Sequence, residues 1–185
     1  MNESRLKLAV AASIRELVFG LEDSLVSTLG AVTGIAAGTH RPDLVILSGL
    51  VILSVEAVSM AAGSFLSSKS AMEVEKTIGG LRKFFRPSAP SGPVRNAVVM
   101  GISYVVGGLI PLVPYFFLPT SLAAVPSVLG TALALFGIGI AIGKFAGHAP
   151  LKHGFQMVGI SLIAAGIGYG IGRIGSAVVG MEIVR

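Results

Sequence analysis

The sequence predicts an all-α polytopic membrane protein with five transmembrane helices. Only 12% of its 185 residues are charged and 53% are hydrophobic, whereas about a quarter of the residues are charged in an ordinary soluble domain. The apolar residues come in runs of about twenty, the length that crosses roughly 30 Å of hydrocarbon as a helix. The 25 glycines fit close helix packing in lipid. A transmembrane β-barrel would show short alternating segments instead.

Composition excludes several classes of function. The net charge of +5 is typical of a membrane protein with basic cytoplasmic loops, and we expect no nucleic-acid partner. The chain has no cysteine, which excludes disulfides, thiolate metal sites and cysteine nucleophiles. No cleavable signal peptide is evident. No nucleophile–base pair or His/Cys cluster is present either, so we expect neither an enzyme nor a bound cofactor.

The N-terminal third predicts an interfacial helix and two spans. Residues 1–16 mix apolar and charged residues, which indicates a short amphipathic helix at the membrane surface. The first span covers about 17–38 and ends in a tight polar loop. Pro42 in this loop marks the approach to the second span, which covers about 44–66.

The remainder predicts one polar segment and three further spans within a single membrane domain, 1–185. Residues 67–94 read as a short cytosolic helix followed by a proline-rich linker. The third span contains Pro111 and Pro114, which kink or unwind a helix where neighbouring helices satisfy the freed carbonyls. The last three spans cover about 95–117, 122–144 and 154–176.

The distribution of basic residues predicts the orientation. With the N-terminus inside, eleven Lys and Arg residues fall on the inner side and three on the outer side. Since cytoplasmic loops carry an excess of Lys and Arg, this predicts an N-in, C-out protein. The inner set is Arg5, Lys7, Arg15, Lys69, Lys76, Arg82, Lys83, Arg86, Arg95, Lys144 and Lys152, and the outer set is Arg41, Arg173 and Arg185.

The first two spans contain acids at positions where acids are costly. Asp23 and Met60 each lie about 9 Å inside the cytosolic end of their spans, at 1.5 Å rise per residue. Glu56 lies one turn deeper, near the midplane, and shares a helical face with Met60. Intramembrane acids usually line ion or proton paths. We therefore take Asp23, Glu56 and Met60 as the candidate ion site.

The residue types predict the kind of ion. Carboxylates suit hard divalent ions, and a thioether adds a preference for softer transition metals, so the set favours Fe²⁺ or Mn²⁺ over Ca²⁺. A carboxylate buried without a partner holds its proton more strongly than in water. Exchange of metal for protons at one site follows from both properties. Met60 alone could instead be a packing residue.

Three further acids are secondary candidates for metal binding. Glu22 lies beside Asp23, and alternatively pairs with Arg15 near the interface. Glu73 and Glu75 follow the second span, where they either relay cations or simply lie on a solvated helical face. They rank below Asp23, Glu56 and Met60.

The chain also carries three motifs in one order: Arg15–Ser27, Glu56–Ser70 and Gly107–Tyr115. Together they resemble the vacuolar iron transporter family, over nearly the whole chain. The resemblance implies a five-helix fold, a homodimer with the ion path between subunits, and proton-coupled export of Fe²⁺ or Mn²⁺ from the cytosol. The family's aspartate falls on Asp23 and its methionine on Met60. We expect a short prokaryotic-type member in the cytoplasmic (inner) membrane.

Some positions depart from the family pattern. Plant members carry a longer cytosolic extension that collects metal, whereas the extension here is short and net basic. Ser24 stands where glycine is common. Ile52 stands where some members have a further glutamate, and Glu56, one turn along, is the candidate to replace it.

The alternative function is a non-transporting membrane scaffold or assembly partner that docks through the basic segment 67–94.

Overall fold

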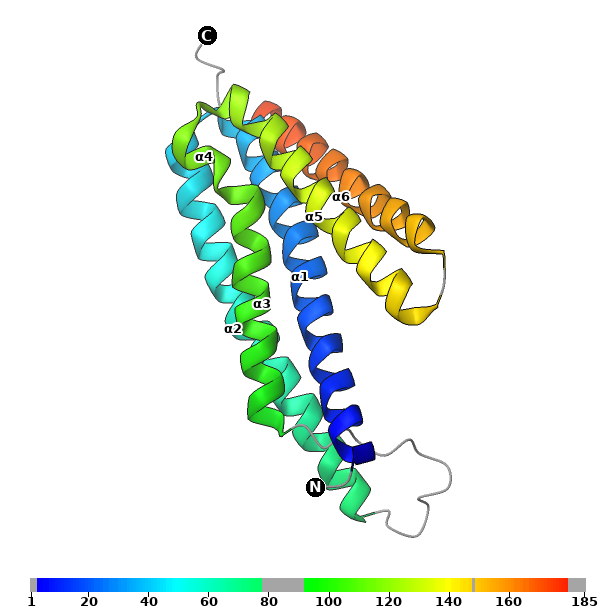
Figure 1. The fold of residues 1–185 in the computed structure, drawn as a ribbon. Helices are drawn as coiled ribbons and strands as arrows, with labels where there is room; N and C mark the ends of the chain where they lie inside the picture. Colours follow the sequence, from blue (N-terminus) through cyan, green and yellow to red (C-terminus); the bar gives the residue numbers. More distant parts are fainter. Residues whose placement is uncertain (1–2, 78–91, 148, 180–185) are drawn as a thin grey trace.

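The computed structural model describes residues 3–77, 92–147 and 149–179, with side chains over 13–74, 92–145, 147 and 149–178. These residues form helices and their connections, without a strand (Figure 1). The helices are α1 (Glu3–Thr39), α2 (Pro42–Thr77), α3 (Pro93–Leu112), α4 (Pro114–Phe117), α5 (Thr120–Ala146) and α6 (Pro150–Val179).

The predicted all-α fold with five spans is confirmed. Five of these helices are long and apolar enough to cross a membrane: Ser13–Thr39, Pro42–Val74, Pro93–Leu112, Thr120–Phe145 and Pro150–Val178. The 37 residues of α1 and the 36 of α2 extend well beyond the length needed, since about 20 residues cross the hydrocarbon. The first residues of α1 and the last of α6 lie at opposite ends of the bundle (Figure 1), as an odd number of spans requires.

Two helix boundaries differ from the expected ones. The predicted interfacial helix and the first span form one continuous helix, because no glycine or proline interrupts the chain between Glu3 and Phe19. The predicted third span is divided at Val113 into α3 and α4. Pro114 cannot donate a backbone hydrogen bond and its ring disturbs the preceding turn. The Ser127 hydroxyl of α5 donates to Pro111 O at 2.7 Å across this break.

Helix α1 occupies the centre of the arrangement. It packs most extensively against α6 and α3, and also contacts α2 and α5. Figure 1 shows α1 between the α2–α3 pair on one side and the α5–α6 hairpin on the other. Because every other long helix contacts α1, the rotation of α1 about its own axis decides which of its residues each neighbour covers.

Glycines allow α1 to approach α3 and α6 closely. On the α3 side, a Cβ on Gly107 would lie 2.1 Å from Ser24 Oγ. On the α6 side, a Cβ on Gly168 would lie 2.0 Å from Gly30 O, and one on Gly172 would lie 1.9 Å from Gly34 O. Such contacts leave no room for a side chain, so the predicted role of the glycines in helix packing applies to these residues.

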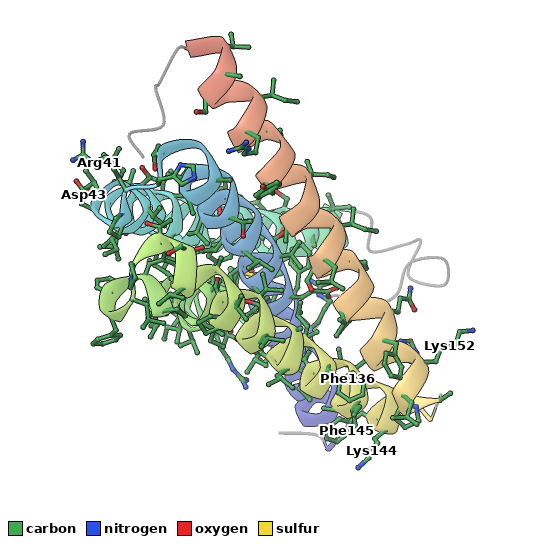
Figure 2. The ribbon with its side chains drawn as sticks, turned by 90° about the horizontal axis from the view of Figure 1, so that it is seen from above. Arg41, Asp43, Phe136, Lys144, Phe145 and Lys152 are labelled. Atoms are coloured by element: carbon green, nitrogen blue, oxygen red, sulfur yellow. The ribbon has the colours of Figure 1, made fainter. Side chains whose placement is uncertain are left out.

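The α5–α6 hairpin is held by similar contacts. A Cβ on Gly139 would lie 2.7 Å from the Cα of Gly154, and the rings of Phe136 and Phe155 pack edge to face with centroids 5.2 Å apart. In Figure 2, Lys144 and Lys152 lie at the turn of this hairpin, away from Arg41 and Asp43 at the α1–α2 turn. The hairpin is therefore a second close-packed unit attached to α1 through α6.

The α1–α6 contact predicts an asymmetric response to alanine. Gly168→Ala should lower the free energy of unfolding by about 1–3 kcal/mol, because the new methyl group must displace the α1 backbone. Gly170→Ala is the matched control, since a Cβ there meets nothing within 4 Å. The control should be neutral or stabilising by about 0.5–1 kcal/mol, the usual gain of alanine over glycine in a helix.

Thermal unfolding of both purified variants in the same detergent measures this difference. Equal melting temperatures for Gly168→Ala and Gly170→Ala would show that α1 and α6 do not approach as closely as described.

Candidate metal site

The side chain of Glu56 lies among helices α1, α2 and α3. Its Oε2 accepts a hydrogen bond from Ser27 Oγ of α1 at 3.2 Å, and another from the hydroxyl of Tyr104 on α3. The two hydroxyl groups also contact each other, with 2.8 Å between Ser27 Oγ and Tyr104 Oη. One intramembrane carboxylate thus joins three helices through hydrogen bonds.

The number of protons on each hydroxyl decides which of the two donates in their mutual contact. A tyrosine hydroxyl has a single proton, which Tyr104 uses for Glu56, so in the contact between the two hydroxyls Ser27 is the donor and Tyr104 the acceptor. The Ser27 proton is then shared between Tyr104 Oη and Glu56 Oε2, both of which lie within hydrogen-bonding distance. Both donors therefore offset the desolvation of the carboxylate.

Asp23 lies at one end of an open groove between α1 and α6. The groove encloses about 740 Å³ and is lined almost entirely by apolar and small side chains. Asp23 is close enough to Glu56 for their charges to interact, but it makes no hydrogen bond within the described part of the chain. The lining residues are Asp23, Val26, Ser27, Gly30, Ala31, Gly34, Ile35, Gly38, Thr39, Ile52, Ala164, Ile167, Gly168, Ile171, Gly172, Gly175 and Ser176.

The packing of α1 on α3 sets the direction of this polar face. Ser24 and Thr28 are fully buried, and both hydroxyls lie where a Cβ on Gly107 or Gly108 of α3 would be. Since residues one position away point about 100° further round the helix, Asp23 and Ser27 face away from the centre of the α1–α3 contact. The Ser24 hydroxyl is accommodated because Gly107 has no side chain.

Met60 lies one turn from Glu56 on the same helix. Its partly buried side chain packs against the cluster of Leu53, Ala57 and Tyr104. Met60 therefore shares Tyr104 as a neighbour with Glu56. The predicted association of Met60 with the acidic site stays a prediction as regards direct binding of a metal.

The three secondary candidates lie in different surroundings. Glu22 is partly exposed beside Asp23, and its alternative partner Arg15 instead pairs with Glu16 at 2.6 Å. Glu73 is exposed and lies 3.9 Å from Lys69, seventeen residues from Glu56, which is about 25 Å along a helix. The side chain of Glu75 lies outside the described residues. The structure thus brings only Glu22 near the candidate site.

The described side chains bring a pair of acids together at the candidate site, Asp23 and Glu56. Within the side chains that the structure describes, no three His, Asp or Glu residues converge as a metal site would require. Asp23 and Glu56 form a pair of acids, whereas an octahedral site for Mn²⁺ or Fe²⁺ takes about six ligands from protein and water.

Glu16 is the one acid among the buried polar residues that the structure describes, and it was not among the predicted ligands. It is only 3% exposed, at the N-terminal part of α1. Ser64 of α2 donates to its Oε2 at 3.0 Å, and Arg15 pairs with its Oε1. Since both oxygens have partners inside the protomer, Glu16 holds α1 against α2 and is a poor candidate for a free ligand.

Sequence reasoning also missed Tyr104. The available signal was a tyrosine in the middle of an apolar span, since a phenolic hydroxyl buried in lipid usually needs a polar partner. Ser27 lies four residues after Asp23, a spacing that puts both on one face of a helix, but the sequence does not indicate that Glu56 is its partner. These two hydroxyls complete the group around Glu56.

Comparison with known proteins gives consistent matches. A model of the VIT family matches residues 14–82 and 80–173. The chain is 25% identical over 214 aligned positions to "Vacuolar iron transporter 1" of Eucalyptus grandis, covering 86% of this chain and 85% of the relative. It is 31% identical over 177 positions to "Vacuolar iron transporter homolog 5" of Oryza sativa subsp. japonica, covering 91% of this chain and 84% of the relative. The two family matches meet at 80–82, within the polar segment that was predicted to be short.

Proposed function

This chain belongs to the VIT family, and on that premise we propose that it carries Fe²⁺ or Mn²⁺ across a membrane in exchange for protons. The observation that supports this most directly is the pair of intramembrane acids, Asp23 and Glu56, on neighbouring helices. Two acids held this close in an apolar environment are costly unless a cation or protons compensate them.

The proposed metal site consists of Asp23, Glu56 and Met60, with Glu22 close by. Carboxylate oxygens bind any hard divalent ion, and the Met60 thioether shifts the preference toward Fe²⁺ and Mn²⁺. Relatives named as iron transporters support the same class of cargo. Glu73 and Glu75 keep at most a role in attracting cations at the surface.

Proton exchange follows from the same two acids. A carboxylate must lose its proton to bind a metal ion, so binding one divalent ion at Asp23 and Glu56 releases up to two protons. Release of the metal lets the acids take up protons again, which returns the site to its neutral state. The metal and the protons therefore compete for one site, and a pH gradient can drive metal movement against its own gradient.

We propose export from the cytosol of a prokaryotic cell, across the inner membrane. This direction rests on the N-in orientation that the distribution of Lys and Arg predicts. In that orientation Asp23 and Met60 lie nearer to the cytosolic ends of their spans than to the outer ends. The site therefore loads from the cytosolic side.

We further propose that the transporter is a homodimer. Asp23 faces an open groove, and its carboxylate makes no hydrogen bond within the described residues. A second copy that places its own Asp23 face against the first would supply further ligands and enclose the ion path. The alternative role as a docking scaffold rests on residues of which 78–91 lie outside the described part of the chain.

The flux prediction concerns Asp23 and Glu56. In proteoliposomes loaded to give a pH gradient, Asp23→Asn and Glu56→Gln should each lower Mn²⁺ and Fe²⁺ uptake by at least about a hundredfold, since even loss of an outer partner of a metal ligand costs about ten- to a hundredfold. Asp43→Asn is the control, because this acid is exposed and pairs with Arg41 at the α1–α2 turn.

Wild-type uptake should also require the pH gradient and vanish when an ionophore dissipates it. Undiminished uptake in both acid variants would contradict the site, and uptake that ignores the gradient would contradict proton coupling. A folded wild-type protein without any metal uptake would contradict transport itself.

The dimer prediction concerns mass in a mild detergent. Light scattering should give a protein mass of twice the 18.8 kDa of one chain. Gly175→Leu, on the α6 wall of the groove where a Cβ meets nothing within 4 Å, should weaken the dimer because its bulk would enter the groove. A wild-type protein that is monomeric at all concentrations would count against a shared ion path.

A further inference from the structure

The two oxygens of Glu56 are not equivalent. Oε2 receives both hydroxyl contacts, from Ser27 and from Tyr104. Oε1 has no hydrogen-bond partner among the residues that the structure describes. A carboxylate held in this way offers lone pairs chiefly through Oε1, since the lone pairs of Oε2 are already directed at donors.

The Tyr104 side chain is firmly held. It is 1% exposed and packs with Leu53, Ala57 and Met60 from α2. Its ring has only two rotatable bonds, so holding its hydroxyl on Oε2 loses little conformational entropy. Because Ser27 approaches the same oxygen from α1, rotation of the Glu56 carboxylate about its last bond would break contacts with two helices at once.

Divalent cations differ in whether they bind a carboxylate through one oxygen or through both. Ca²⁺ takes six to eight oxygen ligands at long distances and commonly binds a carboxylate through both oxygens. Smaller divalent ions such as Mg²⁺ keep an octahedral shell and accept single carboxylate oxygens, and Mn²⁺ shares the octahedral oxygen geometry. A carboxylate restricted to one oxygen therefore penalises Ca²⁺ more than the smaller transition-metal ions.

We propose that Tyr104, assisted by Ser27, determines specificity in this transporter by restricting Glu56 to one metal-binding oxygen, which disfavours Ca²⁺ relative to Mn²⁺ and Fe²⁺. The inference rests on the proposed function, because it requires Glu56 to contact the transported ion. Tyr104 is a positioning residue, since it acts on the ion only through Glu56.

Selectivity separates this role from a purely structural one. Loss of packing or stability at Tyr104 would lower the uptake of every ion, but would leave the ratio of Ca²⁺ to Mn²⁺ affinity unchanged. Tyr104→Phe keeps the ring and removes only the hydroxyl. Tyr115→Phe is a matched control on α4, because Tyr115 is also 1% exposed and belongs to a different buried cluster, with Val32, Val45 and Leu112.

The test is Mn²⁺ uptake into proteoliposomes under a pH gradient, with Ca²⁺ as the competitor. In Tyr104→Phe the ratio of the Ca²⁺ inhibition constant to the Mn²⁺ KM should fall about tenfold, the effect of about 1.4 kcal/mol. Ser27→Ala should lower the ratio by about threefold, because Tyr104 still holds Oε2. Tyr115→Phe should keep the wild-type ratio.

The outcomes distinguish this inference from the proposed function. A wild-type ratio in both Tyr104→Phe and Ser27→Ala, with Mn²⁺ uptake intact in the wild type, would overturn the inference alone. No Mn²⁺ uptake by the folded wild-type protein would overturn the proposed function and the inference with it. If Tyr104→Phe does not fold, Ser27→Ala decides the question, since it truncates a partly exposed side chain by a single oxygen.

Discussion

The close approach of α1 to α3 and α6 is the constraint on which the rest of the structure depends. In a membrane no hydrophobic effect drives helices together, and association rests on close packing and a few polar contacts. Here α1 meets α3 through Gly107 and α6 through Gly168 and Gly172, each at distances that exclude a side chain. With these faces occupied, Asp23 faces the open groove.

The acids differ in how their burial is compensated. Glu16 receives a hydroxyl from Ser64 and a guanidinium from Arg15, and Glu56 receives hydroxyls from Ser27 and Tyr104. Asp23 has no such partner within the described chain and has acids, Glu22 and Glu56, for charged neighbours. Because a charge in an apolar span is costly without a partner, Asp23 is the acid that would gain most from a bound cation or a proton.

Much of the fold could be predicted because it depends on length and polarity along the chain. Five apolar runs correspond to five candidate spans, and Pro42, which marked the approach to the second span, is the first residue of α2. The continuity of α1 follows from the absence of glycine and proline between Glu3 and Phe19, a signal that the amphipathic pattern of residues 1–16 outweighed in the prediction. The division at Val113 followed from Pro114, whereas the hydrogen bond from Ser127 of α5 to Pro111 O could not be predicted from spacing along one helix.

The candidate site was predicted from residues on α1 and α2 alone, and the part that α3 contributes was not predicted. Helical spacing placed Asp23 and Ser27 on one face and Glu56 and Met60 on another, but it could not say what α3 contributes. Ser24, which replaces a common glycine, fits because Gly107 leaves space for its hydroxyl. Glu56 is held because Tyr104, one turn before Gly108 on the same helix, reaches its Oε2. Both departures from the family pattern thus have their physical counterpart on α3, so residues on α1 and α2 cannot be assessed as ligands until the third helix is in place.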